Sequence, residues 1–102
     1  MTTGIRISHS TGQTRSALTI SNLGQQLAHV LPARDWRKIQ HLFGGRFADI
    51  AHIPSREAGK IADILCKAAG DRRMPSEWAD LARLFADAGH RAARSGQTWT
   101  WE

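Results

Sequence analysis

The stretch SREAGKIADILCKAAGDRRMPSEWADLARLFADAGHRAARSG, residues 55–96, decides the fold of this chain. In its first half, apolar residues recur at helical spacing from Ala58 to Ala69. This pattern predicts an amphipathic helix with Ser55 as its N-cap and Gly70 at the position just past its end.

The second half of this stretch predicts the longest helix in the chain. Residues 75–78 supply a proline followed by a serine, which is a common helix opening, and Gly96 marks the end. The apolar residues that recur at helical spacing in between are Trp78, Leu81, Ala82, Phe85 and Ala88. Arg and Asp alternate on another side of this helix, which is typical of a solvated structural face.

Outside this stretch, the N-terminal part predicts a strand followed by a helix. Residues 5–8 alternate between apolar and polar side chains, as in a half-buried strand, and a polar turn-forming run follows. A helix is then expected from Ser21 or Asn22, with Pro32 as its stop. Its apolar positions are Leu23, Leu27, Val30 and Leu31.

The middle of the chain predicts a second short element and a hairpin. Residues 36–43 have the apolar spacing of a helix capped by Asp35, although the same residues also fit a strand. Gly44 and Gly45 provide a tight turn, after which the chain is expected to return in an extended form towards residues 53–54.

The C-terminal tail predicts a docked strand. Trp99 and Trp101 alternate with threonines, so both indoles would point to the same side of an extended strand. We expect this strand to pair with residues 5–8. The fold class is then α+β, with three to four helices packed on a small antiparallel sheet formed by the N-terminal strand, the Gly-Gly hairpin and the Trp-rich strand.

Length and composition limit the organisation of the protein. The 102 residues predict one domain, residues 1–102, with a single core. Cys66 is the sole cysteine, which excludes an internal disulfide and fits a reducing, cytoplasmic location. The N-terminus lacks an apolar leader, and no apolar run is long enough to span a membrane.

The positive charge points to an anionic partner. The chain has 14 Lys and Arg against 9 Asp and Glu, which favours contact with phosphates or an acidic protein. The residues that form the basic candidate surface are Arg56, Lys60, Lys67, Arg72 and Arg73. The first three lie within about 40° on a helical wheel, and none is an Asn or Gln suited to reading bases, so sequence-tolerant binding of nucleic acid backbone is expected. Asp63 in the same stripe also fits an ordinary solvated face with ion pairs.

An alternative function is protein–protein interaction, as a homodimer or as an inhibitor of another protein. This alternative relies on exposed aromatic side chains, which are enriched in interfaces. The candidate residues are Trp36, Phe43, Phe47, Trp99 and Trp101. If Trp99 and Trp101 instead pack in the core, the alternative loses two of its three tryptophans.

The sequence favours a non-enzymatic protein without metal or cofactor. The five histidines and Cys66 lack the spacing of a zinc site. Ser8, His9 and Ser10 are adjacent, but neighbours on a strand point to opposite faces, so a nucleophile–base hydrogen bond between them is not expected. Cys66 lies beside an apolar helix face, where a thiol behaves as a small hydrophobic group.

Four short segments carry a resemblance to a known group of proteins. They are residues 5–10, residues 35–37, residues 53–55 and residues 99–101. Their layout resembles small uncharacterised proteins of GC-rich actinobacteria. The resemblance implies a domain family of unknown function and an actinobacterial or actinophage origin, and it transfers no activity, cofactor or site to these residues.

Overall fold

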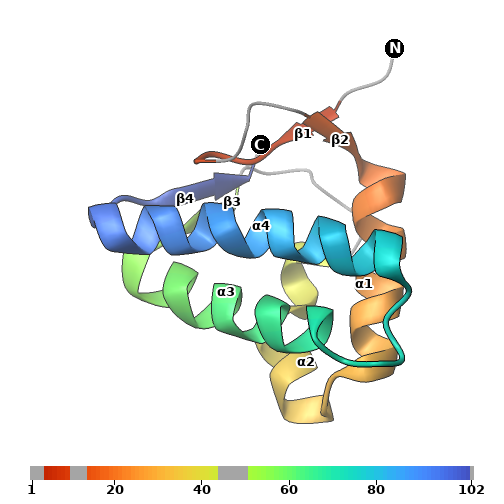
Figure 1. The fold of residues 1–102 in the computed structure, drawn as a ribbon. Helices are drawn as coiled ribbons and strands as arrows, with labels where there is room; N and C mark the ends of the chain where they lie inside the picture. Colours follow the sequence, from red (N-terminus) through yellow and green to blue (C-terminus); the bar gives the residue numbers. More distant parts are fainter. Residues whose placement is uncertain (1–3, 10–13, 44–50, 102) are drawn as a thin grey trace.

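The computed structural model describes residues 4–9, 14–43 and 51–101 as an α+β fold (Figure 1). Its elements in chain order are β1 (Gly4–Arg6), β2 (Thr14–Ser16), α1 (Ala17–Val30), α2 (Ala33–Ile39), the 3-10 helix η1 (Gln40–Phe43), β3 (Ala51–Ile53), α3 (Ser55–Ala69), α4 (Ser76–Ser95) and β4 (Trp99–Trp101). The predicted fold class is confirmed at this level. In the described residues, no helix is long and apolar enough to cross a membrane.

The helices α3 and α4 form an antiparallel hairpin, side by side along their length (Figure 1). Both predicted helices are confirmed. The buried faces of both helices are rich in alanine, which lets the two backbones approach closely, while Trp78 and Leu81 of the predicted α4 face are half-buried. At Gly89, a Cβ atom would lie 3.1 Å from both the Ala62 Cβ and the Trp99 ring. A side chain at this position would therefore push the tail strand away from the hairpin.

The ends of the two helices differ in part from the prediction. Pro54 stands at the N-cap of α3, and Ser55 is the first helical residue and makes no capping hydrogen bond. Gly70 keeps a right-handed conformation, with φ of −82°. Gly96 instead adopts φ of 67°, the left-handed conformation that glycine favours, and ends α4. The Gln97 N–H donates to the Ala92 carbonyl across this turn, at 3.0 Å.

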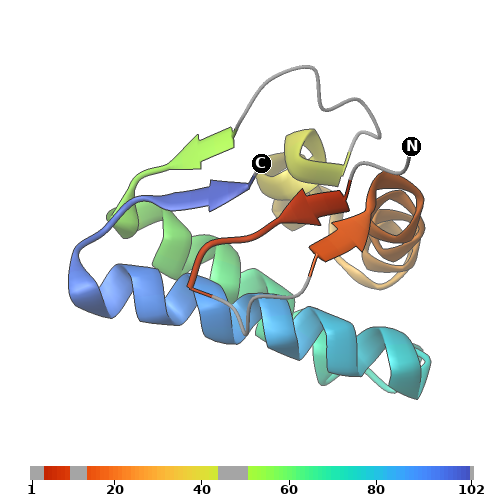
Figure 2. The same cartoon turned by 90° about the horizontal axis from the view of Figure 1, so that it is seen from above.

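The turn at Gly96 sends β4 back across the helices, where it meets strands from two other parts of the chain (Figure 2). β4 pairs antiparallel with β3, with Ile53 opposite Trp99 and Ala51 opposite Trp101. On its other side, β4 meets the N-terminal segment through an Ile7–Trp101 bridge and a 2.8 Å hydrogen bond from the Ser8 N–H to the Thr100 carbonyl.

The strand pairing corrects two expectations. The backbone pairing of the N-terminal segment with the tail is made by Ile7 and Ser8, whereas β1 itself pairs antiparallel with β2. We expected a polar turn up to Thr14 and then no strand, whereas Thr14–Ser16 pairs with Gly4–Arg6. A hairpin partner nearby in sequence costs less loop-closure entropy than a distant one, which favours the local pairing.

The middle of the chain is helical where the sequence left two possibilities. Residues 36–43 belong to α2 and η1, which settles the choice in favour of the helix. Gly44 and Gly45 lie outside the described residues, the residues just before them form η1 instead of a strand, and β3 pairs with β4. The Gly-Gly hairpin is therefore not confirmed. α1 begins at Ala17, four residues before the predicted cap at Ser21.

The core lies between the strands and the helices, and Trp101 is at its centre. Its ring contacts Phe43 and Phe85, each with ring centroids 5.5 Å apart, and Trp99 at 5.2 Å. Both tail indoles are fully buried, with 0% exposure, so the predicted docking of the tail is confirmed. The docked tail holds β4 over α4. The side of α3 that points away from α4 is left free to face α2.

Candidate functional site

A groove of about 510 Å³ lies between α3 and the α2–η1 segment. Its lining residues are Lys38 and His41 from α2–η1, and Glu57, Lys60, Ile61, Asp63 and Ile64 from α3. Asp35 near the start of α2 contacts Lys67 near the end of α3. The residues that line the groove come from α3 and from the α2–η1 segment.

The apolar part of the groove comes from two isoleucines on α3. Ile61 is buried and Ile64 is half-buried. Around them, Lys38 and His41 lie on one side, with Glu57, Lys60 and Asp63 on the other, and all five are exposed. The groove therefore combines an apolar base with a rim that carries charges of both signs.

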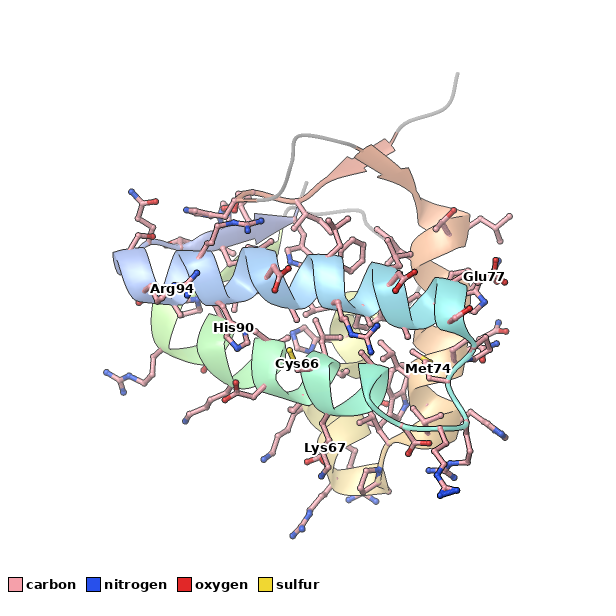
Figure 3. All side chains as sticks on the ribbon, viewed as in Figure 1. Cys66, Lys67, Met74, Glu77, His90 and Arg94 are labelled. Atoms are coloured by element: carbon pink, nitrogen blue, oxygen red, sulfur yellow. The ribbon has the colours of Figure 1, made fainter. Side chains whose placement is uncertain are left out.

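An ion pair joins the two sides at one end of the groove. Lys67 Nζ donates to Asp35 Oδ2 at 3.1 Å, and Asp35 is buried apart from 9% of its surface. Figure 3 shows Lys67 extending from α3 on the side away from α4. This pair satisfies the buried carboxylate and holds α2 against α3, so Lys67 acts first as a structural residue.

Positive charge is concentrated on the surface made by α2, α3 and the loop after α3, which we call the α2–α3 face. We define it by its cations, which are Arg34, Arg37, Lys38, Arg56, Lys60, Lys67, Arg72 and Arg73. The acidic residues of the same segments are Asp35, Glu57, Asp63 and Asp71. In the part of the chain that the structure describes, three of these acids form ion pairs and six of these cations form none. The six are Arg34, Arg37, Lys38, Arg56, Lys60 and Arg72.

The two arginines of the loop differ from one another. Arg73 donates to both carboxylate oxygens of Asp71, at 3.1 Å and 3.0 Å, and to the Val30 carbonyl at 2.9 Å. These hydrogen bonds lower the pKa of Asp71 to about 2 and raise the pKa of Arg73. Arg73 thus ties the loop to α1, whereas Arg72 is exposed and has no such partner in the described residues.

The outer face of α4 has balanced charge, with three acidic and three basic residues. They are Glu77, Asp80, Arg83, Asp87, Arg91 and Arg94. Arg83 pairs with Asp80 at 3.3 Å, and Arg91 donates to the His9 carbonyl at 2.6 Å. This agrees with the structural role predicted for the face.

The structure places the five basic residues predicted as a site in one region. Arg56 and Lys60 are exposed and one helical turn apart on α3, Lys67 is paired with Asp35, and Arg72 and Arg73 follow in the loop. Four further residues of this region were not predicted from the sequence, namely Arg34, Arg37, Lys38 and His41. The spacing of Arg34 and Lys38, four residues apart, was a usable signal once residues 36–43 are taken as a helix.

The aromatic residues proposed for a protein partner are largely unavailable. Trp99, Trp101 and Phe43 are buried, which contradicts their exposure in that alternative, because the docked tail places both indoles against α4 and η1. Trp36 is half-buried, and Phe47 lies outside the described residues. The one large hydrophobic residue that is exposed among those described is Leu18, at 70%.

Cys66 lies on the exposed side of α3 near α4 (Figure 3). Its pKa is raised, first by partial burial and then by the carboxylates of Asp87 and Asp63. Both causes disfavour the thiolate, which is the nucleophilic form. Within residues 4–9, 14–43 and 51–101, no three His, Cys, Asp or Glu residues are grouped in a way that would hold a metal ion.

The side chains of Ser8 and His9 contact each other, which the prediction of a regular strand did not allow. His9 has φ of 64°, so the chain turns and its Nδ1 lies 3.1 Å from Ser8 Oγ, a contact that a regular strand would forbid. Ser8 Oγ also accepts the Thr100 N–H at 2.8 Å, and His9 Nε2 lies 2.7 Å from Gln97 Oε1. These bonds connect the N-terminal segment to the tail, and they engage both ring nitrogens of His9.

Comparison with known proteins places the chain in one family. A family model described as Domain of unknown function (DUF7739) matches residues 7–102, which is nearly the whole chain, so the chain belongs to this family. No curated protein and no solved structure gives a match. The predicted membership of a domain family of unknown function is confirmed, and the α2–α3 face lies within the matched residues.

Proposed function

We propose that this member of the DUF7739 family is a non-enzymatic binding protein that holds the backbone of a nucleic acid on its α2–α3 face. It would act as a small cytoplasmic accessory or regulatory protein. The observation that carries the proposal is the unequal pairing of charges on this face. In the described residues, six of its exposed cations form no ion pair, whereas three of its four acidic residues do.

The position of these cations supports backbone contact. Lys38 and Lys60 lie on the two sides of one groove, and Arg34 and Arg56 each lie one turn along the helix from them. Cations on two segments can contact successive phosphates, and each contact releases condensed counterions. Phosphate contacts position a nucleic acid without reading its sequence, so binding is expected to be sequence-tolerant.

The charge of α4 supports the same assignment by contrast. The positive net charge of the protein comes almost entirely from outside α4, because the three acids and three bases of that helix cancel. A binding face and a neutral face in one small molecule would orient a polyanion as it approaches.

Fluorescence anisotropy with labelled single-stranded and duplex oligonucleotides tests the proposal. The double variant Lys38→Ala/Lys60→Ala should bind about tenfold more weakly at low salt, and its slope of log K against log[salt] should be shallower by about 0.7–0.9 for each phosphate that the variant no longer neutralises. The matched control is Arg83→Ala/Arg94→Ala, which removes the same number of charges from α4.

The proposal requires that the control binds like the unaltered protein. If neither oligonucleotide binds at low salt, or if both double variants weaken binding equally, the α2–α3 face is not a nucleic-acid site. A protein then becomes the better candidate for the partner of this chain.

A further inference from the structure

The groove contains carboxylates where a backbone-binding surface would be expected to contain cations alone. Glu57 lines the groove and has no ion pair in the described residues, and Asp63 lines it further along α3, with one carboxylate oxygen 2.9 Å from His90 Nε2 of α4. A phosphate placed beside these carboxylates would meet negative charge at close range, which is unfavourable. The phosphates of a bound strand are therefore expected at the part of the rim formed by Lys38 and Lys60.

The base of the groove suits a different chemical group. Ile61 and Ile64 provide an apolar surface, and the nearby carboxylate oxygens of Glu57 and Asp63 are hydrogen-bond acceptors. A nucleobase fits this combination, because its ring can lie on apolar side chains while an exocyclic amino group donates to a carboxylate. The groove volume of about 510 Å³ lies within the range of small-ligand sites.

A duplex cannot use the groove in this way. Its bases are stacked and paired inside the double helix, whereas a single strand can turn individual bases outward into a protein pocket. The contact with the isoleucines and carboxylates is therefore available to single-stranded nucleic acid alone, while the rim cations can contact either form.

From this arrangement we infer that the protein binds single-stranded nucleic acid in preference to duplex, with one unpaired base in the α2–α3 groove. The inference rests on the proposed function and adds the form of nucleic acid to it. Because Glu57 and Asp63 accept hydrogen bonds, bases with an exocyclic amino group, such as cytosine, should bind better than thymine or uracil.

Competition experiments at fixed salt test the inference. The competitors are oligo(dC), oligo(dT), oligo(rC) and a duplex of equal length, each displacing a labelled oligo(dC). The expected order is oligo(dC) and oligo(rC) ahead of oligo(dT), with the duplex weakest by about tenfold when compared at equal phosphate number. Comparison of oligo(dC) with oligo(rC) reports whether DNA or RNA is preferred.

Two variants connect the preference to the groove. Ile64→Ala should reduce the advantage of oligo(dC) over the duplex by about threefold, since it removes part of the apolar base but no charge. The control Leu84→Ala truncates another half-buried residue, on α4, and should leave the ratio unchanged. The melting temperature of each variant confirms that it is folded. Glu57→Gln, which is exposed and does not threaten folding, should narrow the difference between oligo(dC) and oligo(dT).

The outcomes separate the two proposals. Equal or tighter binding of the duplex would overturn the inference and leave backbone binding in place. The same holds if Ile64→Ala leaves the advantage of oligo(dC) over the duplex unchanged and Glu57→Gln leaves the difference between oligo(dC) and oligo(dT) unchanged. Failure of every competitor, together with failure of the labelled oligo(dC) to bind directly, would overturn backbone binding as well.

Discussion

The helices α3 and α4 have similar inner faces and very different outer surroundings. On the inside, both bury alanines against each other. On the outside, α4 has balanced charge and supports the tail strand, whereas α3 borders a groove with unpaired cations. The difference supports our proposal that one helix of the hairpin mainly stabilises the fold, whereas the other would face a partner. Substitutions that disturb the packing of α4 and the tail should therefore change stability, and substitutions of the unpaired cations beside the groove should change binding.

The largest expected effect is on stability, at the tail. Trp101→Ala should lower the free energy of unfolding by about 3–5 kcal/mol, because a fully buried aromatic ring is replaced by a cavity between Phe43 and Phe85. Chemical denaturation measures this loss. If the variant unfolds at the same denaturant concentration as the unaltered protein, the tail is not part of the core.

The close approach of the tail to α4 gives the next effect. Gly89→Val should cost about 1–3 kcal/mol, since its side chain would meet Ala62 and the Trp99 ring. Gly59→Ala is the control: its Cβ would be at an ordinary 3.4 Å from the Ala93 Cβ, so it should stabilise the helix by about 0.5–1 kcal/mol. Thermal melts of both variants should shift in opposite directions.

The ion pair between α2 and α3 has a smaller effect. Lys67→Met should cost about 1 kcal/mol, because the buried Asp35 carboxylate loses a hydrogen-bond donor. Lys60→Met, on the same helix but unpaired, should change stability by no more than about 0.5 kcal/mol while weakening oligonucleotide binding. Equal stability losses would show that Lys67 and Lys60 have the same role.

The smallest effect concerns the loop after α3. The pKa of Asp71 is lowered from 3.8 to about 2 by Arg73, so the stability it contributes is present above pH 3.8 and is lost as the pH falls through about 2. NMR titration of the carboxyl group measures this midpoint, and Asp71→Asn removes the contribution. A midpoint near 3.8 in the unaltered protein would mean that the Asp71–Arg73 hydrogen bonds do not form in solution.

The periodic parts of the fold were predictable from the sequence, and the long-range pairings were less so. α3 and α4 follow from apolar spacing, and the docked tail follows from its alternating tryptophans. The strand at Thr14–Ser16 has no apolar alternation and forms because Gly4–Arg6 lies close to it in sequence. The Ser8–His9 contact depends on the left-handed φ of His9, which the residue types around it do not specify.

The candidate site was predictable only in part. The cations of α3 were identified from their shared stripe, but the opposite side of the groove depends on α2, whose helical form the sequence left open. The loss of Phe43, Trp99 and Trp101 as interface residues depends on burial. Burial is set by the whole fold and is not visible in the local pattern.

One measurement tests the distinction between the two helices most directly. The amide chemical shifts of the labelled protein are followed by NMR during titration with an oligonucleotide at low salt. We predict that the perturbed residues cluster in α2, η1 and α3, around Lys38 and Lys60, while the exposed residues of α4 stay unchanged. Perturbations concentrated on α4, or none at all, would contradict the assignment of the α2–α3 face.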